Sequence, residues 1–232
     1  MSNITLLHGS DHIIEIPDFN FGSSKNDYGK GFYCTREHEM AREWACKTNA
    51  SGFVNEYKMD MTQMNVLNLL DPQYSILNWM ALLLKNRTFS LTTELSIDAR
   101  DYLLEHYLID LSTYDVVIGY RADDSYFRYA ESFVTNTLSL RSLNKALRLG
   151  KLGEQTVVIS KRGFDALSFV GAYPVDRSIY YPKFLHRDTS AREAYKTEVK
   201  SGRAYRDDIF VLDILREELS NDDPRIQRII SE

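Results

Sequence analysis

The stretches LLHGS at residues 6–10 and GKGFYCT at residues 29–35 decide the expected fold of this chain. The apolar residues of the first predict a short buried strand that ends at His8, where Gly9 and Ser10 turn the chain. The second is a glycine-rich turn that leads into a brief extended segment. Each is common by itself, because a histidine at a strand end is usually structural and a Gly-Lys-Gly loop is usually a turn. Their meaning therefore depends on their order and surroundings.

The rest of the chain alternates polar loops with periodic apolar segments. Residues 17–31 are rich in Gly, Ser, Asn and Asp and predict a loop. Strands are expected at 53–59, 66–70, 114–118, 155–160 and 179–184, and helices at 36–47 behind a Thr35 cap, 71–86 behind Asp71, 94–109, 123–134, 140–150 and from about 190 onward. Without an internal repeat or a flexible linker, this pattern predicts a single α+β domain over 1–232, with a core of about 1–185 and a helical C-terminal extension of about 186–232.

The composition is that of an ordinary globular protein. The 232 residues are 44% hydrophobic and 26% charged, which excludes wholesale disorder and a disulfide-stapled miniprotein. The net charge of −5 gives no indication of general binding to phosphate backbones. The N-terminus lacks the basic and apolar regions of a signal peptide, and the longest apolar patch, 79–84, is too short to cross a bilayer. A cytoplasmic protein with no membrane partner is expected.

In this order, the two quoted stretches resemble the first two signature motifs of the poly(ADP-ribose) polymerase and diphtheria toxin branch of ADP-ribosyltransferases. That branch has a strand ending in H-G-[ST], then G-x-G-x-Y-[FLC]-[AT], and a His-Tyr-Glu triad. The chain is also similar to an uncharacterised bacterial family of the same clan, in which Gln often takes the third triad position. The resemblance covers about the first 50 residues and, more loosely, 114–170. It implies a split, strongly bent β-sheet with NAD⁺ in a cleft between its halves.

The resemblance also implies a role for each matching residue. His8 would hydrogen-bond a ribose hydroxyl of NAD⁺. Gly9 would present its backbone N–H and C=O to the nicotinamide carboxamide, with no Cβ to obstruct the ligand. Tyr33 would stack on the nicotinamide ring, and Ser10 and Gly31 would complete the cofactor-binding set. Such residues act by orienting the substrate and by binding the transition state more tightly than the ground state.

The resemblance leaves two points open: the role of Trp44 and the identity of the third triad residue. Trp44 either stacks on the other face of the nicotinamide ring or belongs to the apolar face of its helix. The third triad residue is Gln155 or Glu154, since a shift of one residue along a strand reverses the face, and the family pattern favours Gln155. Glutamine cannot act as a general base, so chain-forming polymerase activity is not expected. The activities that remain compatible with glutamine are mono-ADP-ribosylation, NAD⁺ hydrolysis and binding of NAD⁺ without turnover.

Two classes of function follow from the resemblance. The first is a mono-ADP-ribosyltransferase that modifies a protein or a nucleic acid, as an effector or as the toxin of a bacterial toxin–antitoxin pair with a cognate antitoxin as partner. The second is a non-catalytic regulator that binds NAD⁺ or ADP-ribose. NAD⁺ is then a substrate, and no metal is expected, because the turn at Gly9 breaks the helical spacing of His8 and His12 and adding His38 gives no recognised ligand pattern. The acceptor would be chosen by a loop within 123–153.

Overall fold

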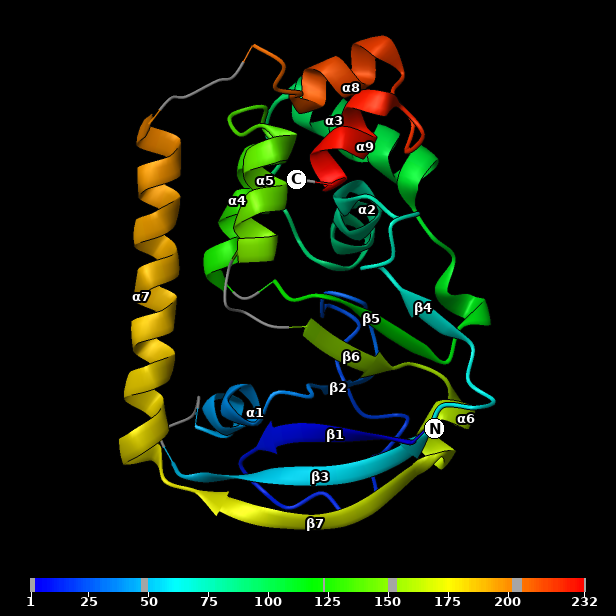
Figure 1. The fold of residues 1–232 in the computed structure, drawn as a ribbon, viewed down its shortest axis with the longest axis vertical. Coiled ribbons are helices and arrows are strands. Elements are labelled where there is room, and N and C mark those ends of the chain that lie inside the picture. Colours follow the sequence, from blue (N-terminus) through cyan, green and yellow to red (C-terminus); the bar gives the residue numbers. More distant parts are fainter. Residues whose placement is uncertain (1–2, 47–49, 123, 150–153, 202–205, 232) are drawn as a thin grey trace. The chain divides into compact units, whose positions relative to one another are not determined.

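The computed structural model describes residues 3–46, 50–122, 124–149, 154–201 and 206–231. The chain has an α+β fold, as expected (Figure 1). It forms two compact units. Unit 1 consists of Met1–Asn68, Leu111–Tyr120 and Leu152–Asp188, and unit 2 of Leu69–Asp110, Arg121–Lys151 and Thr189–Glu232. That the two fold as a single domain stays a prediction.

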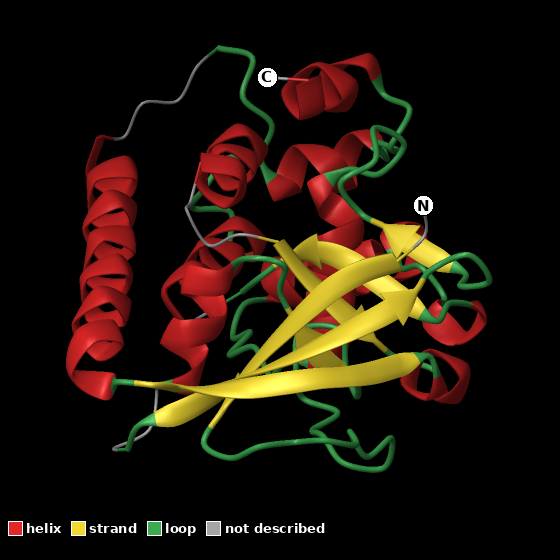
Figure 2. Ribbon diagram, turned by 60° about the horizontal axis from the view of Figure 1, so that its bottom comes forward, coloured by secondary structure: helices red, strands yellow, loops and turns green. Residues whose placement is uncertain are grey.

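Unit 1 contains two β-sheets (Figure 2). The first is antiparallel, with the strand order β1 (Asn3–Ser10), β3 (Gly52–Asp60) and β7 (Leu167–Val175). The second has the order β2 (Phe32–Cys34), β6 (Glu154–Val158), β5 (Val116–Tyr120) and β4 (Val66–Asn68), with β4 and β5 parallel and the other pairs antiparallel. The unit also contains α1 (His38–Ala45), the 3₁₀ turn η1 (Leu111–Thr113) and α6 (Lys161–Asp165).

Within the described residues, one isolated bridge joins the two sheets. Leu7 and Thr35 exchange two backbone hydrogen bonds, of 2.8 Å from the Leu7 N–H and 2.9 Å from the Thr35 N–H. One apolar cluster contains residues of both sheets, among them Leu6, Phe32 and Val158. Leu7 points to the opposite face, where it packs with residues of α1. The core of unit 1 is therefore continuous across the place where the hydrogen-bonded ladder is interrupted.

Two expected boundaries around the junction were wrong. Gly9 and Ser10 do not turn the chain but continue β1, where they pair with Val54 and Phe53. Thr35 does not cap a helix directly, because its backbone forms the bridge to Leu7 and α1 begins only at His38. The strand is longer than its apolar run because β3 offers a backbone partner along all of β1.

The expected strand at 179–184 was also wrong. These residues belong to α7 (Arg177–Ser201), although Pro182 lies inside the helix. The strand of this region is instead β7, which contains Gly171 and Pro174 and therefore gives a weak strand pattern. β7 is an edge strand, where a proline that lacks an N–H group is tolerated.

Asp115, which lies just before β5, holds α6. Its carboxylate accepts hydrogen bonds from the Arg162 guanidinium, the Ser160 hydroxyl and, at 2.8 Å, the backbone N–H of Asn65. Ser160 Oγ also caps α6 by accepting a hydrogen bond of 3.0 Å from the Gly163 N–H. These bonds, with that of Arg162 the largest contribution, lower the pKa of Asp115 to about 2.

The structured elements of unit 2 are helices. They are α2 (Ile76–Asn86), α3 (Glu94–Tyr107), α4 (Asp124–Val134), α5 (Leu140–Leu149), α8 (Val211–Glu217) and α9 (Pro224–Ser231), together with the C-terminal part of α7. The cap of α2 is Ser75 and not Asp71, and Asp123 lies outside the described residues. The C-terminal region is helical, as expected. No described helix is both long and apolar enough to span a membrane.

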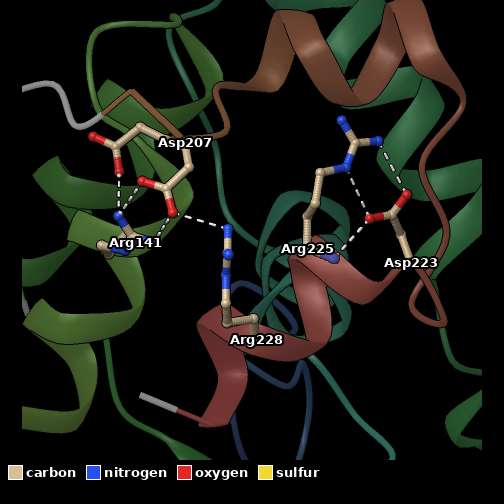
Figure 3. Close-up of polar contacts among 6 residues, drawn as sticks. Arg141, Asp207, Asp223, Arg225 and Arg228 are labelled. Carbon is tan, nitrogen blue, oxygen red and sulfur yellow. Dashed lines mark hydrogen bonds and ion pairs between the residues drawn. The ribbon is translucent and has the colours of Figure 1, made fainter.

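Ion pairs tie α5 and α9 to the segment that precedes α8 (Figure 3). Arg141 of α5 contacts Asp207 at 3.1 Å and Asp208 at 3.3 Å, and Arg228 of α9 contacts Asp207 at 2.8 Å. Arg225 contacts Asp223 at 3.0 Å. Asp207, Arg225 and Arg228 are exposed, so each pair that contains one of them contributes at most about 1 kcal/mol to stability, whereas the Arg141–Asp208 pair is largely buried.

Candidate functional site

The His8 ring lies where the two sheets part. Its Nδ1 is 2.7 Å from the carbonyl oxygen of Tyr33, and its ring centroid is 4.5 Å from that of Phe32. A carbonyl only accepts hydrogen bonds, so Nδ1 carries the hydrogen and, in the neutral ring, Nε2 is an acceptor. Burial is the largest cause that lowers the pKa of His8 below 6.5, which keeps the ring neutral at pH 7. The site therefore offers an imidazole acceptor beside β2.

The backbone of Gly9 points to the same side as the bridge. Leu7 directs its N–H and C=O toward Thr35, and the polar groups of successive residues in a strand alternate between its two edges. His8 therefore pairs with Asn55 of β3, whereas Gly9 directs its N–H and C=O away from β3, toward the edge that faces β2. One donor and one acceptor thus lie next to the His8–Tyr33 contact.

The missing side chain of Gly9 is explained by packing. A Cβ at this position would lie 2.1 Å from the carbonyl oxygen of Ala41, 2.6 Å from the Ala45 nitrogen and 2.8 Å from Trp44 Cβ. Helix α1 therefore occupies the space that we expected to be left for a ligand. Trp44 is half-buried on this helix, next to Gly9, and both its expected roles remain open.

Tyr33 holds the turn that precedes it. Its hydroxyl donates a hydrogen bond of 2.7 Å to the carbonyl of Gly29 and accepts one of 3.0 Å from the N–H of Tyr28. Gly29 has a φ of 76°, which is accessible to glycine at little cost. Tyr33 is half-buried, so its ring retains some accessible surface.

Of the two candidates for the third triad position, Gln155 is the inward residue. Its side chain is 3% exposed, whereas Glu154 is exposed. Gln155 Nε2 donates to Asp27 Oδ2 at 3.2 Å and to the carbonyl oxygen of Tyr120 at 3.0 Å. Val157, two residues along β6 and therefore on the same face as Gln155, pairs with Tyr33.

Gly31 and Ser10 have structural partners. A Cβ on Gly31 would lie 2.7 Å from Val157 Cγ1 and 2.9 Å from the carbonyl oxygen of Val158, so glycine allows the loop to pack on β6. Ser10 Oγ donates to the carbonyl of His12 and accepts a hydrogen bond of 3.0 Å from Asn55 Nδ2. Neither residue has a role that requires a ligand to explain it.

Three polar residues that the sequence analysis did not single out belong to this site. Asn55 is fully buried, and its amide binds Ser10 Oγ, the carbonyls of His8 and His12, and the N–H of Ile14 at 2.8 Å. Asn55 alternates along β3 with Phe53, Tyr57 and Met59, so a polar residue on this otherwise apolar face was a signal for this role. Asp27 and Tyr28 are buried as well, and the Tyr28 hydroxyl donates to the carbonyl of Tyr120 at 2.7 Å. Their position inside a polar loop gave no such signal.

Three further residues lie within or after the second quoted stretch. Arg42 contacts Glu39 at 2.7 Å and lies 5.5 Å from the Tyr180 ring centroid. Cys34 is buried, and burial raises the pKa of its thiol. His38 Nδ1 lies 3.1 Å from the Tyr173 hydroxyl.

Comparisons with known proteins place the chain in a family without assigning a chemistry. The model of a family described as "Protein of unknown function (DUF3990)" matches residues 4–169. The matched region contains β1 except Asn3, β2 to β6, α1 and the first residues of β7, and therefore every residue of the site described above. No curated protein and no solved structure matches the chain.

Proposed function

Because the chain belongs to the DUF3990 family, whose function is unknown, we propose its function from the site: it is an NAD⁺-dependent mono-ADP-ribosyltransferase. Its substrate is NAD⁺, and its acceptor is a protein or a nucleic acid. The proposal includes an ADP-ribosyltransferase-like arrangement of unit 1, in which the two sheets part at the Leu7–Thr35 bridge and the nicotinamide end of NAD⁺ binds beyond it.

One observation carries this proposal: the backbone N–H and C=O of Gly9 point toward β2, next to the contact between His8 and Tyr33. A carboxamide has one acceptor oxygen and a donor NH₂ group, so it complements such a pair. His8 Nε2 is an acceptor beside it, which suits the hydroxyl of a ribose. Nicotinamide riboside combines a carboxamide with ribose hydroxyls.

The proposed chemistry relies on orientation. Breaking the bond between nicotinamide and ribose creates positive charge on the ribose and releases a neutral leaving group. Gly9 would hold the carboxamide, the ring of Tyr33 would stack on the nicotinamide, and His8 would fix the ribose. Such contacts accelerate the reaction when they are stronger in the transition state than in the ground state.

A second function, binding of NAD⁺ or ADP-ribose without turnover, is favoured by the burial of Gln155. This side chain is 3% exposed, and both its amide hydrogens have protein acceptors. In this arrangement Gln155 can offer a ribose only its Oε1, as an acceptor, and an amide cannot act as a general base. A slow NAD⁺ glycohydrolase lies between the two functions. The role as a toxin or effector, with an antitoxin as partner, is proposed on the family resemblance alone.

Calorimetry with NAD⁺, combined with assay of released nicotinamide, tests the proposal. We expect the wild type to bind NAD⁺ and release nicotinamide, and His8→Ala to lose at least about tenfold in affinity, because the acceptor for the ribose is gone. His12→Ala is the matched control, since His12 is exposed and contacts Asp11. Binding without nicotinamide release would favour the second function. No binding at millimolar NAD⁺ would refute both.

A further inference from the structure

The amide of Gln155 has a fixed polarity. Its Nε2 carries two hydrogens, and two acceptors lie within hydrogen-bond distance of it: the carboxylate of Asp27 at 3.2 Å and the carbonyl oxygen of Tyr120 at 3.0 Å. Turning the amide over would place its oxygen against a carboxylate and a carbonyl, both of which only accept. The chemistry of these neighbours therefore determines which end of the amide they hold, and Oε1 is the atom left for another donor.

Asp27 is held in place by its neighbours in the chain. The next residue, Tyr28, is 2% exposed, and its hydroxyl donates to the same carbonyl of Tyr120 that Gln155 uses. The Tyr33 hydroxyl binds the backbone of Tyr28 and Gly29. Asp27 itself is 6% exposed. The carboxylate is thus a built part of the site, anchored through Tyr33 on one side and Tyr120 on the other.

We propose that Asp27 is a positioning residue of the NAD⁺ site: it holds the Gln155 amide so that Oε1 accepts a hydrogen bond from a ribose hydroxyl, and it supplies the negative charge that glutamine lacks. This inference rests on the proposed function. A glutamate in the third triad position would provide both an acceptor oxygen and a charge. In this chain the two properties are divided between Gln155 and the carboxylate behind it.

Replacing Gln155 with glutamate tests this division of roles between Gln155 and Asp27. Gln155→Glu would place a second carboxylate beside that of Asp27, and two carboxylates at about 3 Å do not readily ionise together. This variant is therefore expected to lower the melting temperature and to lose activity. Adding Asp27→Asn returns the number of carboxylates to one, and the new Asn amide can donate to the introduced glutamate. The double variant should recover part of both properties.

The experiment compares Asp27→Asn, Gln155→Glu and the double variant with wild type, by thermal unfolding, NAD⁺ affinity and nicotinamide release. We expect Asp27→Asn to lower kcat at least about tenfold with KM changed less than about threefold, the pattern of a lost electrostatic contribution to the transition state. Gln155→Glu should lower the melting temperature by about 5 °C or more, and Asp27→Asn in the same chain should reverse part of that loss. Asp18→Asn is the matched control, because Asp18 is an exposed carboxylate of the same loop.

The outcomes separate this inference from the proposed function. If wild type releases nicotinamide and Asp27→Asn behaves like Asp18→Asn, the inference is wrong and the proposed function stands. A Gln155→Glu variant more active than wild type would also overturn it. If wild type binds NAD⁺ without turnover, the comparison is made on Kd, and we expect about tenfold weaker binding for Asp27→Asn. If wild type does not bind NAD⁺, the proposed function fails first, and the ligand role of Asp27 fails with it.

Discussion

Replacing Gly9 with alanine tests whether this residue is a glycine for the fold or for a ligand. The new methyl group would point into α1, 2.1 Å from the carbonyl oxygen of Ala41 and 2.6 Å from the backbone nitrogen of Ala45. Both are backbone atoms, so no side chain can rotate away to accommodate the methyl group. The helix would have to move outward by about 1 Å to restore an ordinary van der Waals separation.

Such a movement is expensive because α1 covers an apolar face of the first sheet. Ala41, Ala45 and Cys46 are buried against Leu7 and Val54, and a gap of 0.5–1 Å removes about a quarter to a half of the dispersion energy of each contact. Inserting one methyl group into a packed core costs about 1–3 kcal/mol. With two backbone clashes, we expect Gly9→Ala to lower the free energy of unfolding by about 3 kcal/mol.

Urea unfolding followed by circular dichroism measures this loss. Gly171→Ala is the matched control, because Gly171 is also in a strand of the first sheet and a Cβ there has no neighbour within 4 Å. The control should be neutral or stabilise by about 0.5 kcal/mol, since alanine lowers the entropy of the unfolded chain. Equal unfolding midpoints for wild type and Gly9→Ala would refute the packing explanation. A fully stable Gly9→Ala variant that cannot bind NAD⁺ would assign the glycine to the ligand.

Two further predictions concern polar groups of unit 1. Tyr33→Phe removes one hydrogen bond to Gly29 and one from Tyr28, so it should lower the free energy of unfolding by about 1–3 kcal/mol in urea titrations, and an unchanged midpoint would contradict the role of this hydroxyl in holding the turn. Because the pKa of Asp115 falls from 3.8 to about 2 on folding, the stability that wild type gains over Asp115→Asn should be complete above about pH 5 and disappear as the pH falls through about 2. We expect a gain of about 1 kcal/mol, because the Arg162 side chain is 58% exposed and solvent screens the pair. Thermal unfolding from about pH 3 to pH 7 measures it, with Asp165→Asn as the exposed control, and a pH-independent gain would be inconsistent with a titrating Asp115.

The spacing of apolar residues predicted most elements of unit 1, because this spacing reflects which faces of a strand or helix are buried. The short strand at Phe32–Cys34 and the helix that follows it are confirmed, and Gln155 is buried where Glu154 is exposed. The extent of β1 was not predictable in the same way, since Gly9 and Ser10 are recruited by pairing with β3. Pairing of this kind depends on a partner that a local window does not contain.

The errors near the C-terminus of unit 1 have a different cause. Residues 167–175 contain Gly171 and Pro174, which weaken a strand pattern, whereas 179–184 are rich in aromatic residues, which strengthen one. The structure reverses these local preferences for strand and non-strand, because of where each segment lies in the fold. β7 is an edge strand that tolerates proline, and Asp176 starts α7 by accepting a hydrogen bond of 2.8 Å at its side chain from the Ser178 N–H.

For the site, residue types identified the right strands but not the reasons for the residues. Gly9 accommodates α1, Gly31 accommodates β6, and the Tyr33 hydroxyl holds a turn, so each is required by the fold before any ligand binds. The chemistry that remains for a ligand therefore lies in atoms that have no hydrogen-bond partner among the described residues. They are the N–H and C=O of Gly9, which complement a carboxamide, and two acceptors, His8 Nε2 and Gln155 Oε1, which complement hydroxyl groups. It is this pattern of donors and acceptors, more than the motif letters, that makes NAD⁺ the ligand to test.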